Sequence, residues 1–101
     1  MAYFEKNDIT LSIKLFKKAI SIDDNAEPLL GLASCLRVKD IKLALELAKK
    51  ALTKDPNYVN YDYRKEQLWG EKLQASTEVL LQNKQLKKDV ILAKSKISES
   101  Y

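Results

Sequence analysis

Few residues in this chain have side chains that could carry out chemistry. The 101 residues include no histidine and a single cysteine, Cys35. Without histidine, the chain lacks the usual proton shuttle near neutral pH and every histidine-based catalytic triad or metal site. Cys35 stands among Leu32, Ala33 and Leu36, where we expect a packing residue rather than a nucleophile, because no histidine base is available to raise its thiolate fraction.

The acidic residues form no pattern typical of catalysis or metal binding. The adjacent carboxylates of Asp23 and Asp24 fall at an expected helix end, where such pairs usually serve as turn and capping groups. One cysteine excludes an internal disulfide and a cysteine-cluster metal site, and the sequence has no glycine-rich phosphate loop. We therefore predict a protein that is not an enzyme and that uses no cofactor and no metal.

The basic residues suggest nucleic-acid binding as an alternative function. The net charge is +4, and residues 84–96 hold five lysines against one aspartate. Basic residues interleaved with aromatics can contact phosphates and stack on bases, and a Tyr/Trp cluster precedes this stretch, formed by Tyr58, Tyr61, Tyr63 and Trp69. The lysines are scattered around the expected helix, as on an ordinary solvated face: Lys84, Lys87, Lys88, Lys94 and Lys96. Nucleic acid is therefore the second choice of partner.

An internal repeat marks the elements that must position all these residues. Residues 8–24 and 40–56 are identical at eight of seventeen positions and lie 32 residues apart. A fixed period in the thirties indicates stacked supersecondary units, each of which cannot bury its apolar face alone. Such stacks present surfaces rather than reaction centres, so the repeat predicts a binding function.

The repeated unit resembles a tetratricopeptide repeat, an antiparallel helix pair with a period of about 34 residues. The resemblance spans about 1.7 repeats over residues 2–56. The second helix of the family's unit has small or aromatic residues where helices cross. In this chain these residues are Ser12, Phe16 and Ala19 in the first copy and Ala44, Ala48 and Ala51 in the second. The first helix of the second unit fits the large-large-small-large pattern with Leu29, Leu32, Ala33 and Leu36, and the unit closes at Pro56.

Composition agrees with an all-α fold. The chain has only two Gly and two Pro, and 46% of its residues are apolar. We predict a short α-solenoid of antiparallel helix pairs, forming a single domain over residues 1–101. Residues 1–24 would be a partial first repeat, residues 25–57 the second repeat, and residues 58–101 C-terminal capping helices.

Capping residues and apolar periodicity predict the individual helices. Asp8 and Asp40 each precede an apolar-periodic run as natural N-caps, and Pro28 fits a first helical turn. Helices are expected near residues 9–22, 26–38 and 41–53. In the tail, one apolar stripe runs from Trp69 to about residue 82 and another covers residues 84–97, with a break at Gly70 and a turn at Asn83.

The family resemblance implies a peptide or protein partner on the concave side of the stack. The first helices of successive units line that side, so we expect exposed binding residues at Phe4, Glu5, Glu27, Leu30, Ser34, Arg37 and Val38. Of the Lys, Asn and Arg set by which some family members grip a carboxylate, only Arg37 is in place, so no such clamp is predicted. The expected function is a non-catalytic protein-interaction scaffold.

The C-terminal tail and the absence of targeting patterns bear on the location of the protein. The stretch YRKEQLWGEKLQ resembles the region after the repeats in tetratricopeptide proteins of photosynthetic organisms, some of which assist membrane-complex assembly. An assembly role in a plastid or at the thylakoid thus stays open beside a cytoplasmic default. No apolar run could span a membrane, and the first residues lack a signal-peptide layout, so we expect a soluble chain.

Self-association is also expected from the first helix. Residues 9–22 carry apolar side chains on two flanks, formed by Ile9, Ile13, Phe16 and Ile20 and by Leu11, Leu15 and Ile22. The helix that usually covers such residues is reduced to a stub ending at Tyr3. We expect a homodimer or a partner subunit on the uncovered side.

Overall fold

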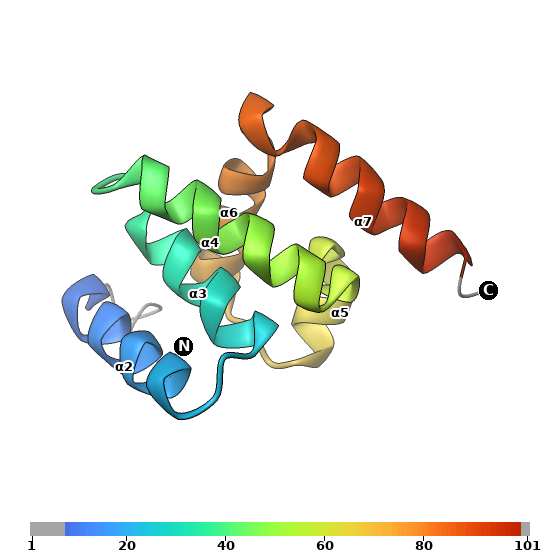
Figure 1. Ribbon diagram of the computed structural model, residues 1–101. Helices are drawn as coiled ribbons and strands as arrows, with labels where there is room; N and C mark the ends of the chain where they lie inside the picture. The colour runs from blue at the N-terminus through green and yellow to red at the C-terminus, as the bar shows by residue number, and fades with distance from the viewer. Residues whose placement is uncertain (1–7, 100–101) are drawn as a thin grey trace.

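A computed structural model describes residues 8–99, and every regular element in this range is helical (Figure 1). The elements in chain order are α2 (Ile9–Ile22), α3 (Ala26–Leu36), α4 (Ile41–Lys54), the 3-10 helix η1 (Pro56–Val59), α5 (Tyr61–Glu66), α6 (Glu71–Leu81), the 3-10 helix η2 (Lys84–Leu86) and α7 (Lys87–Glu99). The prediction of an all-α chain is confirmed for this range. No helix within it has the length and apolarity needed to cross a membrane.

The two repeated helices begin where their caps predict. The Asp8 carboxylate accepts a hydrogen bond from the backbone N–H of Leu11 at 3.1 Å, which starts α2. The Asp40 carboxylate accepts one from Leu43 at 3.2 Å, which starts α4. Between them, α3 ends at Leu36 rather than at residue 38, because residues 37–39 form a turn that leads to Asp40, the N-cap of α4.

The segment after α4 contains two short helices that the periodicity did not predict. Asp55 caps η1 by accepting from the N–H of Asn57 at 3.1 Å, and Asn60 caps α5 by accepting from Asp62 at 3.1 Å. These helices are one turn and under two turns long, so their starts are fixed by local caps. An apolar period cannot reveal elements of that length.

The end of α5 is an unusual left-handed turn. Leu68 has a φ of 66° and is 85% exposed. Its N–H donates a hydrogen bond to the carbonyl of Lys65 at 3.0 Å, and the N–H of Trp69 donates one to the carbonyl of Arg64 at 3.1 Å. This pair of bonds is a Schellman motif, which normally has glycine at the left-handed position. The turn places Trp69 in the link before α6, not on α6 as the stripe predicted.

The rest of the tail follows the expected pattern. Gly70 is the N-cap position of α6, which confirms the predicted break. Asn83 begins the turn into η2, where its side chain accepts from the N–H of Gln85 at 2.9 Å. The second predicted tail helix is thus divided into η2 and α7, which continues to Glu99.

Helix α3 lies at the centre of the packing. It contacts α2, α4 and α6, while α7 packs on α4 and η1, and α2 and α7 lie at opposite ends of the molecule (Figure 1). All residues from Leu29 to Leu36 are buried. Close approach of the helices is permitted by small residues, which include Ala33, Ala44, Ala48 and Ala51, all fully buried, and Gly31 beneath Phe16.

Candidate functional site

The face of α3 assigned to a partner by the repeat pattern is covered by α6. Leu30 is 0% exposed and Ser34 is also buried, so the expectation that both are accessible is wrong. The physical reason is that the predicted tail helix packs along α3 and takes the place that a ligand would occupy. No sequence pattern indicates on which side of the repeat helices the tail would lie.

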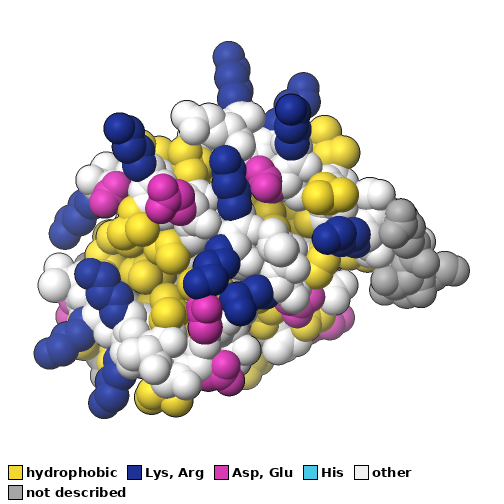
Figure 2. All heavy atoms as spheres, in the orientation of Figure 1, with side chains coloured by type: hydrophobic (Ala, Val, Ile, Leu, Met, Phe, Trp, Pro, Cys, Tyr) yellow, Lys and Arg dark blue, Asp and Glu magenta, His cyan; other side chains and the backbone are white. Residues whose placement is uncertain are grey.

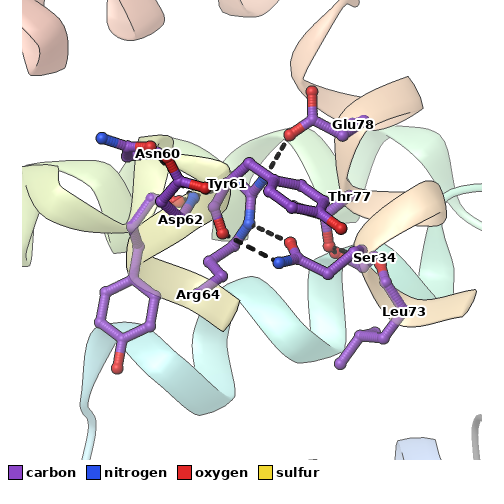
Figure 3. Close-up of polar contacts among 10 residues, drawn as sticks. Ser34, Asn60, Tyr61, Asp62, Arg64, Leu73, Thr77 and Glu78 are labelled. Atoms are coloured by element: carbon purple, nitrogen blue, oxygen red, sulfur yellow. Dashed lines mark hydrogen bonds and ion pairs between the residues drawn. The ribbon is translucent and has the colours of Figure 1, made fainter. Parts of the chain in front are cut away.

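A polar seam joins α3 to α6. The hydroxyl oxygens of Ser34 and Thr77 lie 2.7 Å apart and point toward each other in Figure 3. The Ser76 hydroxyl donates to the backbone carbonyl of Ser34 at 2.8 Å, and Arg37 Nε donates to the Ser76 hydroxyl at 3.1 Å. Ser34 and Arg37, both expected to bind a partner, therefore bind the chain's own α6.

The other predicted binding residues do not form one surface. Glu27 and Arg37 are partly exposed and Val38 is 80% exposed. Glu27 lies in the first turn of α3, whereas the other two follow its last turn, about 15 Å away along the helix. Arg37 and Val38 line a hollow of about 280 Å³ near the start of α2. Phe4 and Glu5 lie outside the described part of the chain.

A larger, charged hollow of about 530 Å³ opens beside Glu27. At its edge, Lys50 Nζ lies 2.9 Å and Lys54 Nζ 3.6 Å from the same oxygen of Asp24, and the bond to Lys50 is the main cause that lowers the pKa of Asp24. The Tyr58 hydroxyl donates to Glu27 at 3.1 Å. Burial, followed by the charge of Glu27, raises the pKa of Tyr58. These contacts tie the start of α3 to the end of α4 and to η1.

The most unusual polar group is a buried arginine that sequence analysis missed. Arg64 on α5 is 0% exposed. Its Nε donates to Gln74 Oε1 at 2.6 Å, its Nη1 donates to the carbonyl of Tyr58 at 3.0 Å, and its Nη2 pairs with Glu78 (Figure 3). Desolvation is the main effect on its pKa and lowers it. No sequence signal could reveal this residue, because arginines are mostly exposed.

The Arg64 cluster, formed by Arg64, Gln74 and Glu78, joins α5 to α6. Gln74, itself buried, donates from Nε2 to the carbonyl of Tyr61 at 3.0 Å, so it bonds to α5 with both ends of its amide. Glu78 is half-exposed, and its carboxylate is held by Arg64 (Figure 3). Because each of these side chains is engaged by a neighbour, the cluster is suited to holding α5 on α6.

The Tyr/Trp cluster is mostly a packing element. Tyr58 and Tyr63 meet edge to face with ring centroids 5.0 Å apart, and Tyr58 lies 6.0 Å from Trp69. Tyr58 and Trp69 are buried, and the indole N–H of Trp69 has no hydrogen-bond partner among the described residues. Within this cluster Tyr61 is exposed and Tyr63 is half-buried. Bases could not stack on the buried rings, which weakens the nucleic-acid alternative.

Two observations on residues 8–99 bear on covalent and metal chemistry. Cys35 is buried, and this burial raises the pKa of its thiol to about 12. The thiolate is the nucleophilic form, so the thiol is held in its unreactive state. No group of three or more Cys, Asp or Glu side chains in this range could hold a metal ion.

Comparisons with protein-family models, with curated proteins and with solved structures gave no match for this chain.

Proposed function

We propose that this chain is a short helical repeat module of the tetratricopeptide type that binds a protein partner and catalyses no reaction. The packing of the two repeated helices supports the repeat assignment. Helices α2 and α4 both lie against α3, and the small residues that the family has at helix crossings are buried at Ser12, Ala44, Ala48 and Ala51.

The tail fits the role of a C-terminal cap. Helix α6 packs on α3 and α7 packs on α4, so each helix of the second unit is covered by one helix of the tail. The end of a repeat stack has to cover an apolar face in this way. In this proposal α6 also closes the α3 face to ligands, and the partner binds elsewhere.

One observation carries the proposal of binding: apolar side chains remain on the surface of both repeated helices. The exposed ones are Ile9, Leu15 and Ile22 on α2 and Ile41 and Leu43 on α4. Figure 2 shows hydrophobic side chains gathered on the side of α2 and α4, with lysines around them. Apolar surface bordered by charged residues is typical of a site for a protein partner.

Selection from an unbiased peptide display library tests the proposal. We expect peptides that bind the chain with Kd values in the micromolar range, as is typical of small transient contacts. Their binding should be lost on the double variant Leu15→Lys/Leu43→Lys and retained on the matched control Ile91→Lys/Leu92→Lys, which changes exposed residues of α7. A failure to select any peptide, or equal loss on both variants, would refute the proposed function.

A further inference from the structure

We propose that the outer side of η2 and α7 docks on an anionic membrane surface. This outer side consists of two aliphatic and four basic residues: Ile91, Leu92, Lys84, Lys87, Lys88 and Lys94. It lies at the end of the molecule opposite to α2 (Figure 1). The surface is separate from the apolar side chains of α2 and α4, so the inference goes beyond the proposed function.

The two aliphatic residues are not part of the core packing of α7. That packing uses an inner stripe with spacings of three and four residues, formed by Val90, Ala93 and Ile97. Ile91 and Leu92 lie beside this stripe and are 58% and 55% exposed. The helix therefore holds two large aliphatic side chains in water.

The charge around them is strongly positive. Residues 84–96 hold five lysines and one aspartate, a local charge of +4 that equals the net charge of the whole chain. The aspartate, Asp89, is half-buried and lines a small hollow with Leu52 of α4. No described residue forms an ion pair with the four outer lysines, and Figure 2 shows lysines projecting from this end with hydrophobic side chains among them. An anionic partner is complementary to this surface.

The arrangement of the aliphatic residues favours a lipid surface over a partner helix. Ile91 and Leu92 are consecutive, so their side chains point about 100° apart and form no stripe. A partner helix packs along an apolar stripe that continues over several turns. On α7 the outer positions one turn before and after the pair are polar and exposed: Lys87, Lys88, Lys94 and Ser95.

A lipid surface makes use of both kinds of side chain. Aliphatic groups of an interfacial helix enter the boundary between headgroups and acyl chains, and flexible lysine stems bring their ammonium groups to lipid phosphates. Nucleic acid offers the same phosphate charge, but Ile91 and Leu92 have no π face on which a base could stack. The exposed ring of Tyr61 belongs to α5 and not to α7. The bilayer is therefore the better match.

Vesicle flotation with the full chain tests the inference. Phosphatidylcholine vesicles that contain about 40% phosphatidylglycerol should bind the chain at least about tenfold more tightly than pure phosphatidylcholine, and added salt should weaken this binding. Lys87→Gln/Lys88→Gln should weaken it about 25-fold, at about fivefold per lysine. Lys17→Gln/Lys18→Gln is the matched control, because it removes the same charge from exposed positions of α2. It should change binding by less than about twofold.

The aliphatic pair distinguishes docking on a bilayer from adsorption to any polyanion. Ile91→Ser/Leu92→Ser keeps every charge and should weaken vesicle binding about tenfold. No binding to the anionic vesicles, equal losses in the two lysine variants, or unchanged binding of the serine variant would overturn the proposal. A submicromolar oligonucleotide complex that is lost in Lys87→Gln/Lys88→Gln would replace the bilayer by nucleic acid. The proposed function is tested separately, because its site lies on α2 and α4.

Discussion

The ring of Phe16 lies directly on the backbone of Gly31. A Cβ atom added to Gly31 would be 2.5 Å from Phe16 Cε1 and 2.6 Å from Cζ, closer than nonbonded carbon atoms can approach. Glycine at this position is therefore required by the aromatic side chain of α2 and not by the backbone conformation, since Gly31 is helical. This contact fixes how closely α2 approaches α3.

The Phe16–Gly31 contact predicts that the effect of Gly31→Ala on stability changes when Phe16 is also replaced. Gly31→Ala should lower the free energy of unfolding by about 1–2 kcal/mol, because overpacking outweighs the gain in helix propensity. In a Phe16→Leu background, the same substitution should be neutral or stabilising by up to about 1 kcal/mol. Urea unfolding of the four chains measures both steps. Equal effects in the two backgrounds would show that the two residues are not coupled.

The Arg64 cluster predicts that Arg64→Lys is strongly destabilising. One ammonium group cannot reach Gln74, the Tyr58 carbonyl and Glu78 together, so buried acceptors lose their donor. We expect a loss of about 3 kcal/mol in the free energy of unfolding. The exposed neighbour provides the control, since Lys65→Ala should change it by less than about 0.5 kcal/mol. Similar unfolding midpoints for the two variants would contradict the role given to Arg64.

The left-handed turn predicts a stabilising substitution. Leu68→Gly should raise the free energy of unfolding by about 0.5–1 kcal/mol, because glycine adopts the positive φ of 66° without the steric cost paid by leucine. Leu68 is exposed, so little burial is lost. Leu68→Ala keeps the steric cost and should be close to neutral. Thermal unfolding compares the three chains, and a lower midpoint for the glycine variant would count against this turn.

The buried thiol predicts a loss of stability at alkaline pH. Folding raises the pKa of Cys35 from its usual value near 9 to about 12, so the folded state keeps a proton that the unfolded state releases. This contribution is complete below pH 9 and is lost as the pH rises toward 12. Between pH 8 and 10, the wild-type chain should lose about 1 kcal/mol more stability than Cys35→Ala. Denaturant titrations at both pH values test this, and parallel losses would exclude it.

Nucleic acid should bind weakly. The lysines of α7 are exposed, but the aromatic rings that would stack on bases are mainly buried. We expect single- and double-stranded oligonucleotides to bind no more tightly than about 10 μM at physiological salt, weaker than ordinary specific complexes. Anisotropy titrations at two salt concentrations provide the measurement. A submicromolar, steeply salt-dependent complex would restore the alternative function.

The elements that the sequence predicts well are those whose ends and faces are encoded locally. Asp8 and Asp40 stand directly before apolar-periodic runs, and α2 and α4 begin after them. Gly70 and Asn83 likewise interrupt the tail where the structure does. Caps and breaks act within one turn of helix, so a single sequence is enough to recognise them.

The candidate site could not be predicted in the same way because it depends on contacts between distant segments. Leu30 and Ser34 are buried by α6, some forty residues later in the chain, as the bond between Ser34 and Thr77 illustrates. The repeat pattern assigns their face but carries no information about what covers it. Arg64 was missed for a related reason, since its burial depends on acceptors contributed by η1 and α6.

The position of Trp69 gives the protein its own optical reporter. It is the only tryptophan of the chain, it is buried, and its ring lies 6.0 Å from that of Tyr58. Its emission should therefore be blue-shifted and fed by energy transfer from tyrosine while the segment between α4 and α6 is docked. Helical circular dichroism is dominated by the longer helices. Comparing the two signals during unfolding would reveal whether this segment detaches before the repeated helices separate.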